Sequence, residues 1–67
     1  MSKWASEEIW RGAIELQRRQ LLQAERPNFI LYHHGRLDPE YTEIYRRKLR
    51  HRIERIRAAG DPAWRET

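Results

Sequence analysis

Two segments with helical periodicity, joined by a short connector, constrain the fold of this chain more than any other feature of its sequence. The first segment covers residues 4–26, with Ser2 or Ser6 available as an N-cap and Pro27 directly after it. Serine is a preferred N-cap, and proline disfavours helical backbone in the residue before it. The sequence therefore predicts a first helix over residues 4–26.

The apolar residues of the first segment recur with the period of an α-helix and fall within an arc of about 160°. The residues in this arc are Ile9, Trp10, Ala13, Ile14, Leu16, Leu21 and Ala24, with Gln17 and Gln20 between them. An arc this wide can contact more than one neighbouring helix. On the other side of the segment, Glu7 and Arg11 have the i,i+4 spacing of an ion pair, so this helix largely neutralises itself.

The second segment has clearer start and stop signals. Asp38 is a good N-cap, and Pro39 suits the first position of a helix. Gly60 suits the left-handed residue that follows a helix, and Pro62 prevents its continuation. These residues predict a second helix over residues 39–59.

The connector, residues 27–38, permits two conformations. Its apolar run, residues 29–32, is too short for periodicity to distinguish a strand from a helix. Pro27 could begin a short helix that Gly35 ends, or an extended segment could pair with its counterpart in a second copy of the chain. We favour the short helical turn, and in either case we expect the apolar side chains to cover the end of the helix pair.

Two long helices of similar length predict an all-α helical hairpin in one small domain, residues 1–67, with a tail over residues 60–67 that frays unless Trp64 docks. A domain of this size buries only about 60% of the surface of its unfolded chain. There is no cysteine to add a disulfide. We therefore expect homo-oligomerisation or a partner to complete the core.

Basic residues are concentrated in the second helix. Residues 45–57 contain seven Lys or Arg and one Glu, whereas residues 1–26 have a net charge of only +1. The apolar arc of this helix consists of Tyr41, Tyr45, Leu49, Ile53 and Ile56. The basic residues, which are the candidates for binding a polyanion or an acidic partner, are Arg46, Arg47, Lys48, Arg50, Arg52, Arg55 and Arg57.

This basic rim has an ordinary interpretation and a functional one. Long arginine side chains often extend across the edge of a helix interface and keep their charged ends in water. The uneven distribution of charge favours a binding surface. Aromatic residues and arginine dominate the energetics of protein interfaces, and a two-helix hairpin cannot easily bury seven aromatic residues. The candidates for a protein interface are Trp4, Trp10, Leu22, Phe29, Tyr32, Ile44 and Trp64.

The sequence thus predicts a small adaptor or inhibitor protein that binds another protein through aromatic residues rimmed by arginine. The alternative is a nucleic-acid-binding protein that uses the basic second helix, chiefly Arg46, Arg47, Arg50 and Arg57, to contact phosphates with little readout of sequence. Tyr32 and the adjacent histidines would then be available to stack on unpaired bases.

No pattern indicates catalysis. The only local cluster of side chains that could bind a metal or take part in catalysis is at His33, His34 and Gly35. Its spacing to His51 and Asp38 matches no standard zinc site. We predict no enzymatic activity, cofactor or metal. The chain lacks an apolar run long enough to span a membrane and a recognisable signal peptide. We therefore expect a soluble cytoplasmic protein without a membrane partner.

Overall fold

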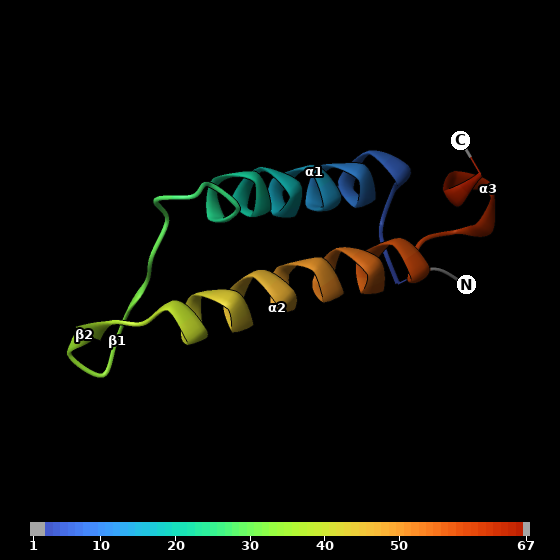
Figure 1. Ribbon diagram of the computed structural model, residues 1–67. Coiled ribbons are helices and arrows are strands. Elements are labelled where there is room, and N and C mark those ends of the chain that lie inside the picture. The colour runs from blue at the N-terminus through green and yellow to red at the C-terminus, as the bar shows by residue number, and fades with distance from the viewer. Residues whose placement is uncertain (1–2, 67) are drawn as a thin grey trace.

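Two long antiparallel helices form the body of the protein (Figure 1). The computed structural model describes residues 3–66, and the chain is mostly helical. A β-hairpin lies at one end of the helix pair, and a short third helix lies at the other. The molecule is elongated, measuring 44 × 18 × 16 Å. The predicted helical hairpin is therefore present, and the segment that joins its two helices contains a small sheet.

Helix α1 covers Glu7–Ala24 and is shorter at both ends than the sequence predicted. It begins three residues late because the Ser6 side chain caps it, accepting a hydrogen bond from the backbone N–H of Ile9 at 3.2 Å. It stops two residues before Arg26, ahead of the conformational restriction that Pro27 imposes. Serine was thus the correct type of cap, and Ser6 is the residue that provides it.

Helix α2 covers Pro39–Ala58, close to the predicted range. Asp38 is its N-cap and accepts a hydrogen bond from the backbone N–H of Tyr41 at 3.0 Å. Pro39 occupies the start of the helix, where its missing N–H is not needed. The start signals in the sequence therefore gave the correct boundary.

The connector forms a β-hairpin, so the short helical turn was wrong. Strands β1 (Tyr32–His33) and β2 (Arg36–Leu37) pair antiparallel within the chain. His34 and Gly35 lie between them, both with positive φ, at 52° and 78°. This is the backbone of a two-residue hairpin turn, which twists in the same sense as the strands it joins. The extended alternative was closer, but the pairing is internal and requires no second copy.

Thr42 attaches the hairpin to α2. Its buried hydroxyl donates to the carbonyl of Asp38 at 2.7 Å and accepts from the N–H of Leu31 at 2.9 Å. The N–H of Asp38 donates in turn to the carbonyl of Leu31 at 3.0 Å. These bonds satisfy backbone groups next to the hairpin and fix its position relative to the helix.

The core lies where α1, α2 and the tail meet. Trp10, Ile14 and Ile53 form a buried cluster, and Trp4, Leu21, Ile56 and Trp64 pack against it. Trp10 is only 4% exposed, and its Nε1 donates to the carbonyl of Ile56 at 2.6 Å. A methyl group added at Gly60 would overlap its indole ring. Trp10 is thus enclosed by all three helical elements.

Trp64 in the tail packs against the core. Helix α3 covers Pro62–Arg65 and is capped by Asp61, which accepts from the N–H of Ala63 at 2.9 Å. The rings of Trp64 and Trp10 lie 5.9 Å apart, within the range of aromatic pairs. Trp64, the residue that the sequence named as able to hold the tail, thus contacts the core.

Asp38 should make stability depend on pH in acid. The hydrogen bond from the Tyr41 N–H lowers the pKa of Asp38, and the nearby His33 and Arg36 act in the same direction. Because the pKa is lower in the folded state, this contribution is present above the unfolded pKa, near 4, and is lost as pH falls through the folded pKa. Urea titrations from pH 7 to 2 should show a smaller acid loss for Asp38→Asn, which keeps a cap without titrating. Equal losses in the two proteins would contradict this assignment.

Candidate macromolecular interface

Two of the predicted polyanion-binding residues are used inside the fold. The guanidinium of Arg46 donates to the carbonyl of Ala24 and to those of Arg26 and Phe29, the last two at 3.4 Å each. Arg46 therefore satisfies carbonyl groups at and beyond the end of α1, and its side chain is only 19% exposed. The structure gives Arg46, a predicted polyanion-binding residue, hydrogen-bond partners inside the fold.

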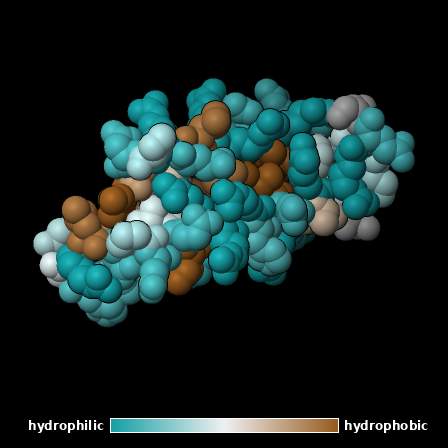
Figure 2. All heavy atoms as spheres, viewed as in Figure 1, coloured by the Kyte–Doolittle hydropathy of each residue, from teal (hydrophilic) through white to brown (hydrophobic). Residues whose placement is uncertain are grey.

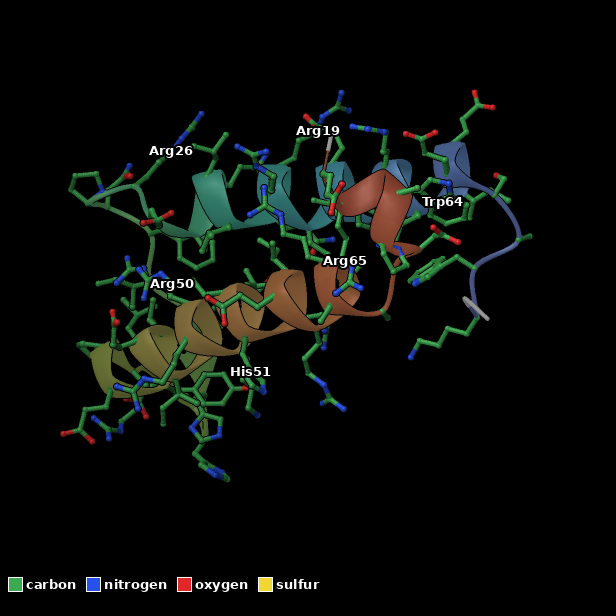
Figure 3. The ribbon with its side chains drawn as sticks, turned by 90° about the vertical axis from the view of Figure 1, so that its right-hand side faces the viewer. Arg19, Arg26, Arg50, His51, Trp64 and Arg65 are labelled. Atoms are coloured by element: carbon green, nitrogen blue, oxygen red, sulfur yellow. The ribbon has the colours of Figure 1, made fainter. Side chains whose placement is uncertain are left out.

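Arg50 also has partners within the chain. Its guanidinium lies 3.4 Å from a carboxylate oxygen of Glu25 and 3.6 Å from one of Glu43. Figure 3 shows Arg50 on the side of α2 that faces α1, with His51 on the outer side. The Arg50 side chain is about half exposed, so its charge is partly neutralised rather than buried.

The other basic row lines an open groove that we call the Lys48 groove, with a volume of about 300 Å³. Its lining residues are Lys3, Trp4, Lys48, His51, Arg52, Arg55 and Ile56. No acidic residue lines it, and among residues 3–66 no carboxylate forms an ion pair with Lys48, Arg52 or Arg55. The positive charge in this groove is therefore not neutralised by a carboxylate of the described residues.

A second open groove, which we call the Arg57 groove, has a volume of about 640 Å³. It brings together residues from all three helices: Trp10, Arg11, Gly12, Ile14, Glu15, Arg18, Arg57 and Arg65. Figure 3 shows Arg65 on α3 beside the end of α2. Glu15 lines this groove, and Arg11 pairs with Glu7 at 2.8 Å, so its positive charge is diluted.

The two grooves lie on opposite sides of the helical hairpin. Arg57 shares its groove with Arg18 of α1, and these residues mark one side. At about 100° per residue, Lys48 lies about 180° around α2 from Arg57, and Arg55 lies about 160° from it. The grooves have no lining residue in common. A ligand bound at one groove therefore does not cover the other.

Helix α1 carries two parallel rows of mainly apolar residues, and α2 covers only one of them. The covered row, the inner seam, consists of Trp10, Ile14, Gln17, Leu21 and Ala24, all buried or half-buried. The other row, the outer seam, consists of Ile9, Ala13, Leu16 and Gln20. Ile9 and Leu16 are 54% and 55% exposed. The wide apolar arc predicted from the sequence is thus only partly used in folding.

The outer seam lies on the same side of the hairpin as the Lys48 groove. Leu16 lies about 160° around α1 from Arg18, and Ile9 lies about 180° from it. Arg18 marks the side of the Arg57 groove. An exposed aliphatic row on α1 and unpaired basic residues on α2 therefore face the same side of the helix pair. We call the outer seam and the Lys48 groove together the seam face.

The predicted protein-interface residues do not form one surface. Trp10 is a core residue, so its assignment to an interface is not supported by its position. Trp4 and Trp64 are half-buried against the core, and Phe29 is half-buried and stacks on Tyr45 at 6.1 Å. The exposed members are Leu22, Tyr32 and Ile44.

Sequence reasoning missed several exposed apolar residues. Ile9 and Leu16 had been placed in a stripe without separating its covered and uncovered parts. Leu37 pairs across the hairpin with Tyr32, and both side chains are exposed. Figure 2 shows the apolar residues of the visible face as separate patches in a largely polar surface. Of these exposed residues, only Ile9 and Leu16 could have been found from the sequence, because the wide apolar arc of the first helix contains them.

The rings of His33 and His34 lie 4.0 Å apart, but His51 does not join them. His33 stacks on Tyr41, with ring centroids 3.8 Å apart, and its Nδ1 lies 3.4 Å from Asp38 Oδ2. His51 instead lines the Lys48 groove. Within residues 3–66, no group of three or more His, Cys, Asp or Glu is arranged to hold a metal ion. None of the helices described has the length and apolar character needed to cross a membrane.

No protein-family model, curated protein or solved structure gives a match to this chain.

Proposed function

We propose that this chain is a non-enzymatic adaptor or inhibitor that binds another protein through the seam face. One observation carries this proposal: two aliphatic side chains more than half exposed, Ile9 and Leu16, lie on the same side of the helix pair as a basic groove without carboxylates. The sequence predicted aromatic residues rimmed by arginine; the proposed surface keeps a basic rim, but its apolar residues are aliphatic. The residues differ from the predicted set because the tryptophans are used largely in folding.

The energetics of association favour this surface. Burying aliphatic side chains contributes about 25 cal/mol per Å² of apolar surface removed from water. A helix with two adjacent apolar seams is typical of bundles with three or more helices, where each helix contacts two neighbours. Unpaired basic residues beside such a seam would accelerate association and select an acidic partner. The outer seam therefore has the properties of an interface.

Nucleic acid is the second candidate ligand, and the acid-free lining of the Lys48 groove favours it. Lys48, Arg52 and Arg55 follow each other along one side of α2, so a phosphate backbone could contact them in turn. These residues replace Arg46 and Arg50 of the predicted site, which have partners inside the fold. Self-association also stays a prediction.

Site-specific crosslinking tests the proposed function. A photo-crosslinking amino acid is placed at position 16 of the full chain, and a second variant carries it at position 22 as a control. Both native residues are exposed leucines of α1, but Leu22 lies about 120° around the helix from Leu16. In native cells, we expect position 16 to give a discrete protein adduct that resists nuclease, and position 22 to give none. Equal labelling from both positions, or no protein adduct from position 16, would contradict the proposal.

A further inference from the structure

We infer that the partner presents an acidic amphipathic helix, which docks against the outer seam with its carboxylates beside the Lys48 groove. This inference rests on the proposed function and specifies the chemistry of the partner. In this arrangement α1, α2 and the partner helix form a three-helix bundle, and the partner helix packs on the outer seam.

The outer seam has the spacing of a helix-packing surface. Ile9, Ala13, Leu16 and Gln20 follow each other at intervals of four, three and four residues. This is the alternation of positions that face a neighbouring helix in a bundle, and the inner seam shows the same alternation toward α2. From Ile9 to Gln20 the seam is about 17 Å long at 1.5 Å per residue. A partner helix of about 12 to 18 residues would cover it.

Charge specifies the rest of the partner. No acidic residue lines the Lys48 groove, and Lys48, Arg52 and Arg55 have no ion-pair partner among residues 3–66. A helix with a neutral or basic flank would leave these charges unpaired or repel them. Glutamate or aspartate beside the apolar positions would complement them. Both requirements together describe an acidic amphipathic helix.

A second copy of this chain fits the seam face poorly. Across a two-fold axis, identical surfaces face each other. In such a dimer the basic residues of one copy would find no carboxylate in the groove lining of the other, because that lining contains none. Like charges held together at an interface disfavour association.

Nucleic acid would contact only the basic half of the seam face. A phosphate backbone would pair with Lys48, Arg52 and Arg55, but Ile9 and Leu16 would remain in water. Aliphatic side chains also lack the flat ring on which unpaired bases stack. An acidic helix uses both halves of the surface.

Peptide titration tests this inference with the full 67-residue protein at about 150 mM salt. The probe is a labelled 18-residue peptide with leucine at the seam positions and glutamate beside them. One control peptide has the same composition in scrambled order, and another replaces glutamate with lysine. We expect the probe to bind at least about ten-fold more tightly than either control. Equal binding of the scrambled peptide would show that charge alone drives the interaction. Equal binding of the lysine peptide would show that acidic residues are not required. Either result would overturn the inference.

Matched variants locate the binding surface. Leu16→Glu should weaken probe binding at least about ten-fold, whereas Leu22→Glu should change it less than about two-fold. Lys48→Glu with Arg52→Glu should also weaken binding, and Arg47→Glu should not. Circular dichroism checks that each variant remains helical. Equal effects within either pair would overturn the assigned surface.

Two further results would overturn the partner assignment. Single-stranded RNA or duplex DNA that binds more tightly than the probe, and that Leu16→Glu does not affect, would assign the groove to phosphates. A mass that doubles with concentration and returns to monomer in Leu16→Glu would assign the seam to a second copy. If crosslinking from position 16 captures a protein while the probe binds no better than its controls, the proposed function stands and the acidic-helix assignment fails.

Discussion

Replacing Trp10 with alanine is expected to unfold most or all of the protein at room temperature. Large-to-small replacement of a buried tryptophan typically costs about 3 to 5 kcal/mol, a large share of the stability of any small domain. Trp10 is 4% exposed, lies against Trp64 and donates to the carbonyl of Ile56. Its loss would open a cavity and remove the docking surface of the tail.

Urea denaturation followed by circular dichroism measures this effect. Trp10→Phe separates its two causes, because phenylalanine keeps much of the apolar volume but removes the indole N–H, which leaves the Ile56 carbonyl with the Ala59 N–H alone. We expect an intermediate loss for that variant and a small one for Leu22→Ala, whose side chain is 70% exposed. A Trp10→Ala protein as stable as Leu22→Ala would show that Trp10 is not the centre of the core.

Replacing Arg46 with methionine is the second large expected effect. Methionine keeps much of the aliphatic stem but removes the donors to the carbonyls of Ala24, Arg26 and Phe29. Hydrogen bonds to charged groups contribute about 1.5 to 3 kcal/mol, so we expect a loss of about 2 to 3 kcal/mol. The positive charge near the end of α1, favourable to the helix dipole, is lost as well.

Arg47→Met is the matched control for this replacement. Arg47 is an exposed neighbour on the same helix and has no ion pair among residues 3–66. We expect its stability change to remain within about 0.5 kcal/mol. Urea midpoints compare the two variants directly. Equal midpoints would mean that the guanidinium of Arg46 does not hold the end of α1.

The helices were predictable because their signals are local. Asp38 and Pro39 specify the start of α2 through an N-cap and a missing N–H, which depend only on neighbouring residues. Ser6 specifies the start of α1 in the same way. The β-hairpin was missed because its turn is His34–Gly35. Asn-Gly or Asp-Gly is the usual signal for such a turn, and a histidine with positive φ is uncommon.

The sequence could not show which basic residues pair inside the fold and which keep unpaired charges. Arg46 reaches a carbonyl 22 residues away in the sequence, and Arg50 reaches Glu25 across the helix pair. Their neighbours Lys48 and Arg52 have the same chemistry but point to the side without acids. Periodicity placed each residue on its helix, but only the packing of α1 against α2 decides which of them keep unpaired charges.

The candidate site differs from the predicted one, because the predicted tryptophans pack in or against the core and the exposed residues of α1 are aliphatic. The width of the α1 stripe correctly indicated more apolar surface than one helix covers. The tryptophans were assigned to a partner because a hairpin of two helices has little room for them. Helix α3 provides part of that room, since Trp64 packs on Trp10 and closes the end of the core.

Crosslinking from position 16 compared with position 22 tests the central claim most directly. Both positions carry exposed leucines on α1, so the comparison isolates the outer seam from general hydrophobicity. We predict a nuclease-resistant protein adduct from position 16 and none from position 22. The same adducts from both positions, or an adduct from position 22 alone, would contradict a protein-binding role for the seam face.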